Sequence, residues 1–90
     1  MLFMVVERFR SAPEVYRRVR EGGRSLPDGL RYVDSWVRAD LTGCFQLMEC
    51  DDAALLQEWI AQWEDLTSFE IVPVTTSAQT QAVMARRESG

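Results

Sequence analysis

The sequence contains no histidine, no lysine and only two cysteines. Without histidine, Ser-His-Asp and Cys-His catalysis are excluded, and a zinc site would need an unusual ligand set. All the basic residues are arginine, and the net charge is −4. An acidic chain without a basic stripe is a poor match for a phosphate backbone. We therefore expect no metal, no cofactor and no nucleic-acid partner.

The two cysteines lie too far apart to pair with each other. Cys44 and Cys50 fall six positions apart in one expected strand, which separates them by about 20 Å. A disulfide needs Cα atoms closer than about 7 Å. Two free and mostly buried thiols fit a reducing compartment.

Long apolar runs are also missing, and none approaches the length of a membrane span. The opening "MLFMVV" lacks a basic n-region and a small-residue cleavage site, so it predicts a strand and not a signal peptide. We expect a cytoplasmic protein with no membrane partner. A chain of 90 residues allows one domain, because a second core would need roughly 50 residues of its own.

The first half of the chain predicts a strand, a helix and a hairpin. Residues 2–9 are β-branched and aromatic, which is typical of a buried strand. Ser11 and Glu14 form a capping box that starts a helix, and the helix should end near Gly22. Two segments of period 2, "LRYVDSWVRAD" and "GCFQLMEC", then predict a β-hairpin.

The second half predicts one more helix and one more strand. Asp51 or Asp52 should cap a helix whose apolar stripe includes Trp59 and Trp63. "FEIVPV" predicts a fourth strand, in which Pro73 favours an edge or terminal position. We expect a domain over residues 1–76, followed at 77–90 by a tail or a short helix.

The order strand, helix, strand, strand, helix, strand is that of a ferredoxin-like α+β fold. Right-handed crossovers place both helices on one face of a four-stranded antiparallel sheet. The other face of the sheet is left uncovered.

Alternation along the hairpin divides its side chains between the two faces of the sheet. We expect the more uniformly apolar set to lie under the helices: Val33, Ser35, Val37, Phe45 and Leu47. We expect the mixed set to lie on the open face: Tyr32, Asp34, Trp36, Cys44, Gln46 and Met48. That face would cover roughly 400 Å², a patch that monomers rarely leave in water. A two-fold homodimer, in which the same face of each subunit covers the other, is the simplest way to remove this patch from water.

The segments "MLFMVVERFR", "GLRYVDSWV" and "CFQLMECDDAALLQEWIAQW" carry a resemblance to a known family. The chain resembles a family of small bacterial single-domain proteins of unknown function, related in fold to dimeric α/β-barrel proteins. The resemblance implies a ferredoxin-like subunit and a dimer, and it implies no activity. Better-understood dimeric barrels often use a histidine in the cleft between sheet and helices. This sequence has none, so no catalytic residue is carried over.

Two interpretations of the open face stay in competition. In the first, the face is the seam of a dimer, in which aromatic side chains supply area and polar groups bond across the two-fold axis. In the second, the two sheets leave a cleft that binds a small, partly aromatic ligand. The candidate ligand-binding residues are Glu7, Tyr32, Asp34, Trp36, Gln46 and Met48.

Catalysis is a further alternative that the sequence leaves open. Any two of Glu7, Glu49 and Glu70 could act as acid and base if they met in a site of low polarity. RNA recognition is disfavoured, because "GCFQLMEC" lacks the aromatic pattern of that fold's third strand. The function classes that remain are a binding domain for a small molecule, a cofactor-independent isomerase or oxygenase, and a structural or interaction protein.

Overall fold

The computed structural model describes residues 1–89. Along the chain its elements are β1 (Leu2–Phe9), α1 (Ala12–Gly22), β2 (Arg31–Val37), β3 (Gly43–Glu49), α2 (Ala54–Trp63), β4 (Thr67–Val74) and α3 (Ser77–Ser89). The sheet has the strand order β2-β3-β1-β4, and every neighbouring pair is antiparallel. The predicted ferredoxin-like α+β fold is confirmed. No helix of residues 1–89 is both long enough and apolar enough to span a membrane.

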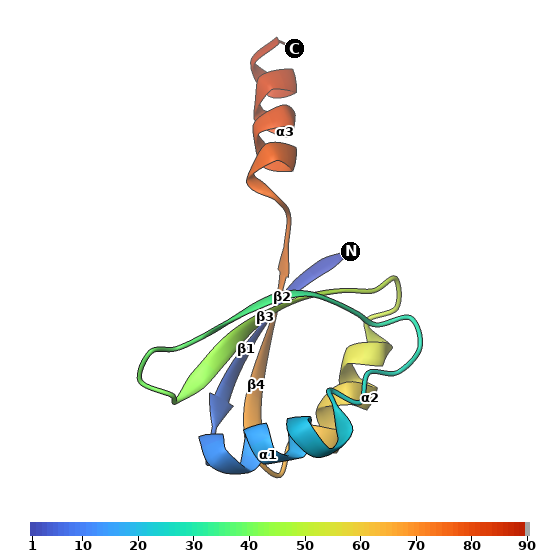
Figure 1. The fold of residues 1–90 in the computed structure, drawn as a ribbon. Helices are drawn as coiled ribbons and strands as arrows, with labels where there is room; N and C mark the ends of the chain where they lie inside the picture. The colour runs from blue at the N-terminus through green and yellow to red at the C-terminus, as the bar shows by residue number, and fades with distance from the viewer. Residues whose placement is uncertain (90) are drawn as a thin grey trace.

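The core lies between one face of the sheet and the helices α1 and α2, which Figure 1 shows on the same side of the sheet. Its buried side chains come from both layers: Phe3, Val5, Val15, Leu30, Met48, Cys50, Leu56, Trp59 and Trp63. Arg18 of α1 contacts the end of α2 at the surface. It forms a salt bridge with Asp65, which follows α2, and its guanidinium lies over the ring of Trp63. The other face of the sheet has no helix on it (Figure 1).

The start of α1 agrees with the sequence, and the start of α2 differs slightly. Ser11 caps α1, since its hydroxyl accepts a hydrogen bond from the backbone N–H of Glu14 at 3.4 Å. Ala53 is the capping residue of α2 and makes no side-chain bond there. The Asp52 carboxylate instead accepts from the N–H of Ala54 at 2.9 Å.

The pairing register decides which side chains share a face. Residues directly opposite one another in antiparallel strands lie on the same side of the sheet. One row across all four strands joins Val37, Cys44, Glu7 and Phe69, and a second joins Ser35, Gln46, Val5 and Ile71. Both rows face the helices. Trp36, Phe45, Val6 and Glu70 form a row on the open face, as do Asp34, Leu47, Met4 and Val72.

This register corrects the predicted division of the hairpin. The placement of Cys44, Gln46 and Met48 on the open face is wrong, because all three are buried on the helix side. The placement of Phe45 and Leu47 under the helices is wrong as well, because both lie on the open face. The predicted alternation of side chains along β3 is correct, but the two faces are exchanged. A shift of one residue in the assignment is enough to do this.

A β-bulge at Val33 explains the remaining errors on β2. Tyr32 pairs with Met48 and Asp34 pairs with Leu47, so one extra residue lies between them on β2. Tyr32 is therefore on the helix side, while Asp34 and Trp36 stay on the open face as predicted. Val33 itself is 49% exposed and lies under no helix, in contrast to the prediction.

Candidate functional site

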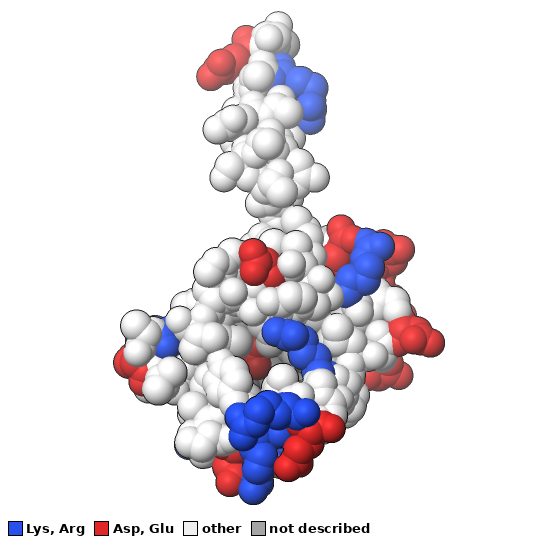
Figure 2. Space-filling view, viewed as in Figure 1, with Lys and Arg blue, Asp and Glu red and all other residues white. Residues whose placement is uncertain are grey.

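A cavity of about 160 Å³ lies between the helix side of the sheet and its cover of α1, α2 and the loop after α1. Its apolar walls are Phe9, Val15, Val19, Val37, Trp59 and Trp63, and its polar groups are Glu7, Tyr16, Arg24, Ser35, Cys44 and Gln46. Figure 2 shows a hollow on this side of the domain, with acidic atoms recessed in it and basic atoms beside it. An apolar cavity of about 150 Å³ is large enough for benzene. The volume therefore fits a molecule about the size of one ring.

A chain of hydrogen bonds runs along the polar wall of the cavity. Gln46 donates from Nε2 to Oε2 of Glu7, and Cys44 donates from Sγ to the same oxygen at 3.0 Å. Arg24 in turn donates from Nε to Oε1 of Gln46 at 3.2 Å. Strand pairing builds this cluster, because Glu7 on β1 lies directly opposite Cys44 on β3 and diagonally opposite Gln46.

Glu7 is only 7% exposed. Its burial raises the pKa of the carboxyl group, and the bonds from Gln46 and Cys44 and the charge of Arg24 only partly offset that rise. Both hydrogen bonds go to Oε2. Within residues 1–89, Oε1 receives no hydrogen bond, so it is available to a molecule in the cavity.

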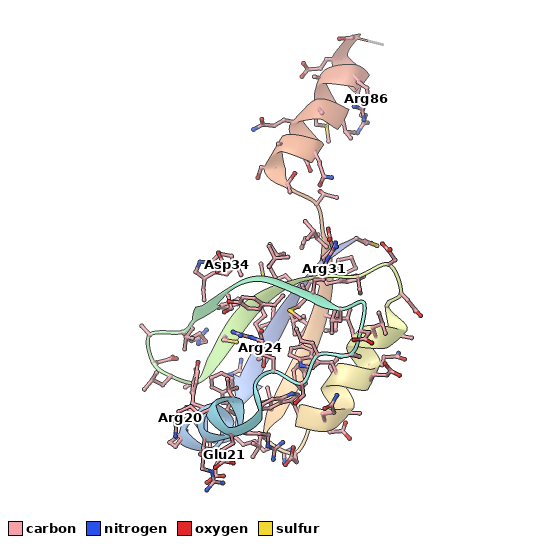
Figure 3. All side chains as sticks on the ribbon, turned by 45° about the vertical axis from the view of Figure 1, so that its right-hand side comes forward. Arg20, Glu21, Arg24, Arg31, Asp34 and Arg86 are labelled. Atoms are coloured by element: carbon pink, nitrogen blue, oxygen red, sulfur yellow. The ribbon has the colours of Figure 1, made fainter. Side chains whose placement is uncertain are left out.

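Arg24 brings a positive charge to the same cavity. Its guanidinium stacks on the ring of Tyr32, with 3.9 Å from Cζ to the ring centroid. Only Nε is used by Gln46, and no carboxylate in the described part of the chain forms a salt bridge with Arg24. Figure 3 shows Arg24 between the sheet and α1. The two terminal nitrogens therefore remain as donors for an acceptor or an anion.

The indole rings of α2 hold the Arg24 loop in place. Trp59 and Trp63 both donate from Nε1 to the backbone oxygen of Arg24, at 2.9 and 3.1 Å. Gln62 donates to the next carbonyl, that of Ser25, at 3.2 Å. Ser25 has a φ of 58°, a conformation that few residues other than glycine adopt. The loop that carries Arg24 is thus fixed by three bonds from one helix.

The thiol and phenol of the cavity are both held in their neutral forms. Burial, followed by the nearby Glu7, raises the pKa of Cys44 well above its usual range. Burial also raises the pKa of Tyr16. A protonated thiol is a poor nucleophile. Cys44 therefore serves as a weak hydrogen-bond donor to Glu7.

The structure brings only part of the predicted site together. Glu7 and Gln46 line the cavity, whereas Tyr32 does not line it but stacks on Arg24, which does. Met48 is fully buried in the core. Asp34 and Trp36 lie on the opposite face of the sheet. A role for any of the six in binding stays a prediction.

Four of the six polar cavity residues were not among the predicted site residues: Tyr16, Arg24, Ser35 and Cys44. Arg24 lies in a loop, Tyr16 is on the helix stripe, and Ser35 was expected under the helices without a role. Of these residues, Arg24 has a local feature in the sequence that could have marked it as a site residue, because it stands between a helix-ending glycine pair and a turn. The alternative in which Glu7 meets Glu49 or Glu70 is not found, because Glu70 lies on the open face and Glu49 pairs with Arg31. No cluster of three or more potential metal ligands occurs in residues 1–89.

The model of one protein family matches residues 1–88, and its description is "Domain of unknown function (DUF3303)". The chain belongs to this family. The match agrees with the expected membership in a family of small domains of unknown function. No curated protein and no solved structure matches this DUF3303 chain. The function must therefore be argued from the cavity.

Proposed function

We propose that this domain binds a small, partly aromatic molecule in the cavity between the sheet and the helices. The ligand offers a hydrogen-bond donor to Oε1 of Glu7 and an anionic or acceptor group to Arg24. The observation that carries the proposal is that both groups keep unused hydrogen-bonding capacity while lining one largely apolar cavity. A few polar groups that converge on a largely apolar cavity are typical of a ligand site.

The size and lining of the cavity narrow the class of ligand. A volume of about 160 Å³ admits a single ring with small substituents. Trp59, Trp63, Tyr16 and Phe9 supply aromatic surfaces. A monocyclic acid with a hydroxyl group meets these conditions, because its hydroxyl donates to Glu7 and its carboxylate accepts from Arg24.

Thermal unfolding with three probes tests the proposal. We expect 4-hydroxybenzoate at millimolar concentration to raise the melting temperature more than benzoate, which lacks the donor, or phenol, which lacks the anion. Arg24→Gln should abolish the advantage of 4-hydroxybenzoate over phenol, whereas Arg20→Gln, at an exposed position of α1, should keep it. Equal melting temperatures with all probes and without them would favour a structural or interaction protein.

Proton-transfer catalysis is a second candidate function, favoured by the raised pKa of Glu7. A carboxylate with a raised pKa is a stronger base, and Tyr16 in the same cavity could return a proton. A cofactor-independent isomerase needs these two roles. Deuterium incorporation from D2O into the CH2 group of phenylpyruvate, a monocyclic acid with acidic C–H bonds beside its ketone, would distinguish turnover from binding when followed by NMR. Glu7→Gln should abolish that incorporation.

We also propose that the domain is a homodimer formed through the open sheet face. Support comes from the apolar side chains on that face: Met4, Val6, Trp36, Phe45, Leu47 and Val72. Trp36 is 51% exposed in the single subunit, and a large exposed apolar patch is typical of an interface. Sedimentation should give about twice the chain mass of 10.3 kDa. A soluble monomer at 100 μM would contradict the proposal.

A cytoplasmic location also remains a proposal, supported by the two free, buried thiols.

A further inference from the structure

The helix α3 projects away from the rest of the domain, beyond the end of β4 (Figure 1). None of its residues is buried, and the apolar side chains of Val83 and Met84 are 42% and 47% exposed. The projection makes the domain 52 Å long, against 30 and 18 Å in the other directions. A helix of 13 residues is marginal in water without packing. It therefore needs a surface to pack against.

The start of α3 is specified by its sequence. Thr76 accepts a hydrogen bond from the N–H of Gln79 at 3.0 Å, and the Gln79 side chain accepts one from the N–H of Thr76 at 2.9 Å. This reciprocal pair is a capping box. Thr75 adds a bond to Thr80 at 3.0 Å. Only Thr75 and Thr76 separate β4 from α3, so the helix begins at a defined point beside the end of the sheet.

The open face of the sheet is the second surface without a partner, and it lies in the same chain. Its footprint is about 400 Å², from four strands about 4.8 Å apart and about 20 Å long. A stable interface covers about 800 Å² on each partner. A helix of 13 residues is about 20 Å long and 10 Å wide, a footprint of about 200 Å². The open face supplies about half of that area, and one helix given and one received, packed beside the face, add about 200 Å² each.

We propose that in the dimer each α3 crosses the interface and packs on the partner subunit. The inference rests on the proposed dimer through the open sheet face. A second copy is the occupant that the observations favour, because a two-fold axis covers each open face with its copy, and each α3 that packs on the partner beside that face brings the area toward that of a stable dimer. Figure 3 shows Arg86 on α3, well clear of the body of its own subunit.

Dissociation tests this exchange. On dilution, the helical circular dichroism signal should fall together with the fraction of dimer, because α3 loses its packing surface when the subunits separate. The double variant Val83→Ser, Met84→Ser should raise the dimer dissociation constant at least tenfold by sedimentation. Gln81→Ser, an exposed polar position on the same helix, is the matched control and should change it less than twofold.

The outcomes separate this inference from the dimer itself. If wild-type protein sediments as a monomer at 100 μM, both the dimer and the exchange of α3 are overturned. A dimer that is weakened by Trp36→Ala but not by the α3 variants overturns the exchange and leaves the dimer standing. In a mixture of ¹³C-labelled and unlabelled subunits, we expect nuclear Overhauser contacts from the Met84 methyl to the other subunit. Contacts confined to its own subunit would show α3 folded back, against the proposal.

Discussion

Replacing Gln46 by leucine should expose the electrostatic cost of burying Glu7. Gln46 is 7% exposed and bridges two charged groups, donating to Glu7 and accepting from Arg24 at 3.2 Å. Leucine has a similar size and makes neither bond. The variant therefore leaves the carboxylate with only the weak Cys44 donor.

The size of the effect follows from the two lost bonds. A hydrogen bond to a charged group contributes about 1.5–3 kcal/mol, so the loss of both costs about 3–6 kcal/mol. The buried apolar surface of leucine returns about 1 kcal/mol. We expect the free energy of unfolding to fall by about 2–5 kcal/mol at neutral pH.

The deficit should depend on pH in one direction. The pKa of Glu7 is raised in the folded protein, so its contribution to stability is fully present at acid pH and is lost as the pH rises through the folded pKa. Gln46 lowers that pKa, so its removal moves the pKa further up. As the pH rises, the free energy of unfolding therefore falls further in the variant than in the wild type. The difference between the two widens with pH.

Urea unfolding followed by tryptophan fluorescence between pH 4 and pH 9 measures this gap. In a Glu7→Gln background, the cost of Gln46→Leu should shrink to about 1–3 kcal/mol, because the bond between positions 7 and 46 then joins two uncharged amides. The reasoning is refuted if the gap is constant across the pH range. An equal cost in the Glu7→Gln background would refute it as well.

Three further substitutions and one labelling experiment test other parts of the structure. Glu7→Gln keeps an acceptor oxygen for Gln46 and Cys44, so by urea unfolding it should be at least as stable as wild type at pH 8, with no gain at pH 4. Trp36→Ala should cost the isolated subunit about 1 kcal/mol, since the ring is half exposed, yet raise the dimer dissociation constant at least tenfold; an unchanged constant contradicts the dimer. Gly43→Ala should destabilise by about 2–3 kcal/mol in the same assay, because the added methyl overlaps the backbone carbonyl of Glu7. Burial keeps both thiols protonated, so iodoacetamide at pH 8 should modify Cys44 and Cys50 only after denaturation, as counted by mass spectrometry.

The order of the elements could be predicted because each start and stop has a local signal. Ser11 and the strand alternation are examples, and both depend only on neighbours in the sequence. The helix α3 has such a signal as well, in the Thr76 and Gln79 capping box. A "T-x-x-Q" pattern is readable from the sequence, and it favours the short helix over a frayed tail.

The faces of the hairpin could not be predicted, because they depend on pairing between strands. The bulge at Val33 has no glycine to mark it. The preference for apolar residues under the helices also misled the assignment, since the covered face carries Glu7 and Gln46 while Phe45 and Leu47 lie outside. Arg24 reaches the site through a loop, whose path is set by bonds from α2. Those contacts link residues 35 and 39 positions apart, beyond any local pattern.

The distribution of polarity across the sheet links the two proposals. In a monomer with no ligand, the arrangement of lowest free energy places apolar rows under the helices and polar rows in water. Here a covered row contains Glu7 and Cys44, whereas the open rows contain Met4, Leu47 and Phe45. Burying a carboxylate carries a cost in free energy, and so does leaving apolar rows in water. A ligand that uses Glu7 offsets the first cost and a second subunit offsets the second. Binding in the cavity and dimerisation are therefore expected together in this domain.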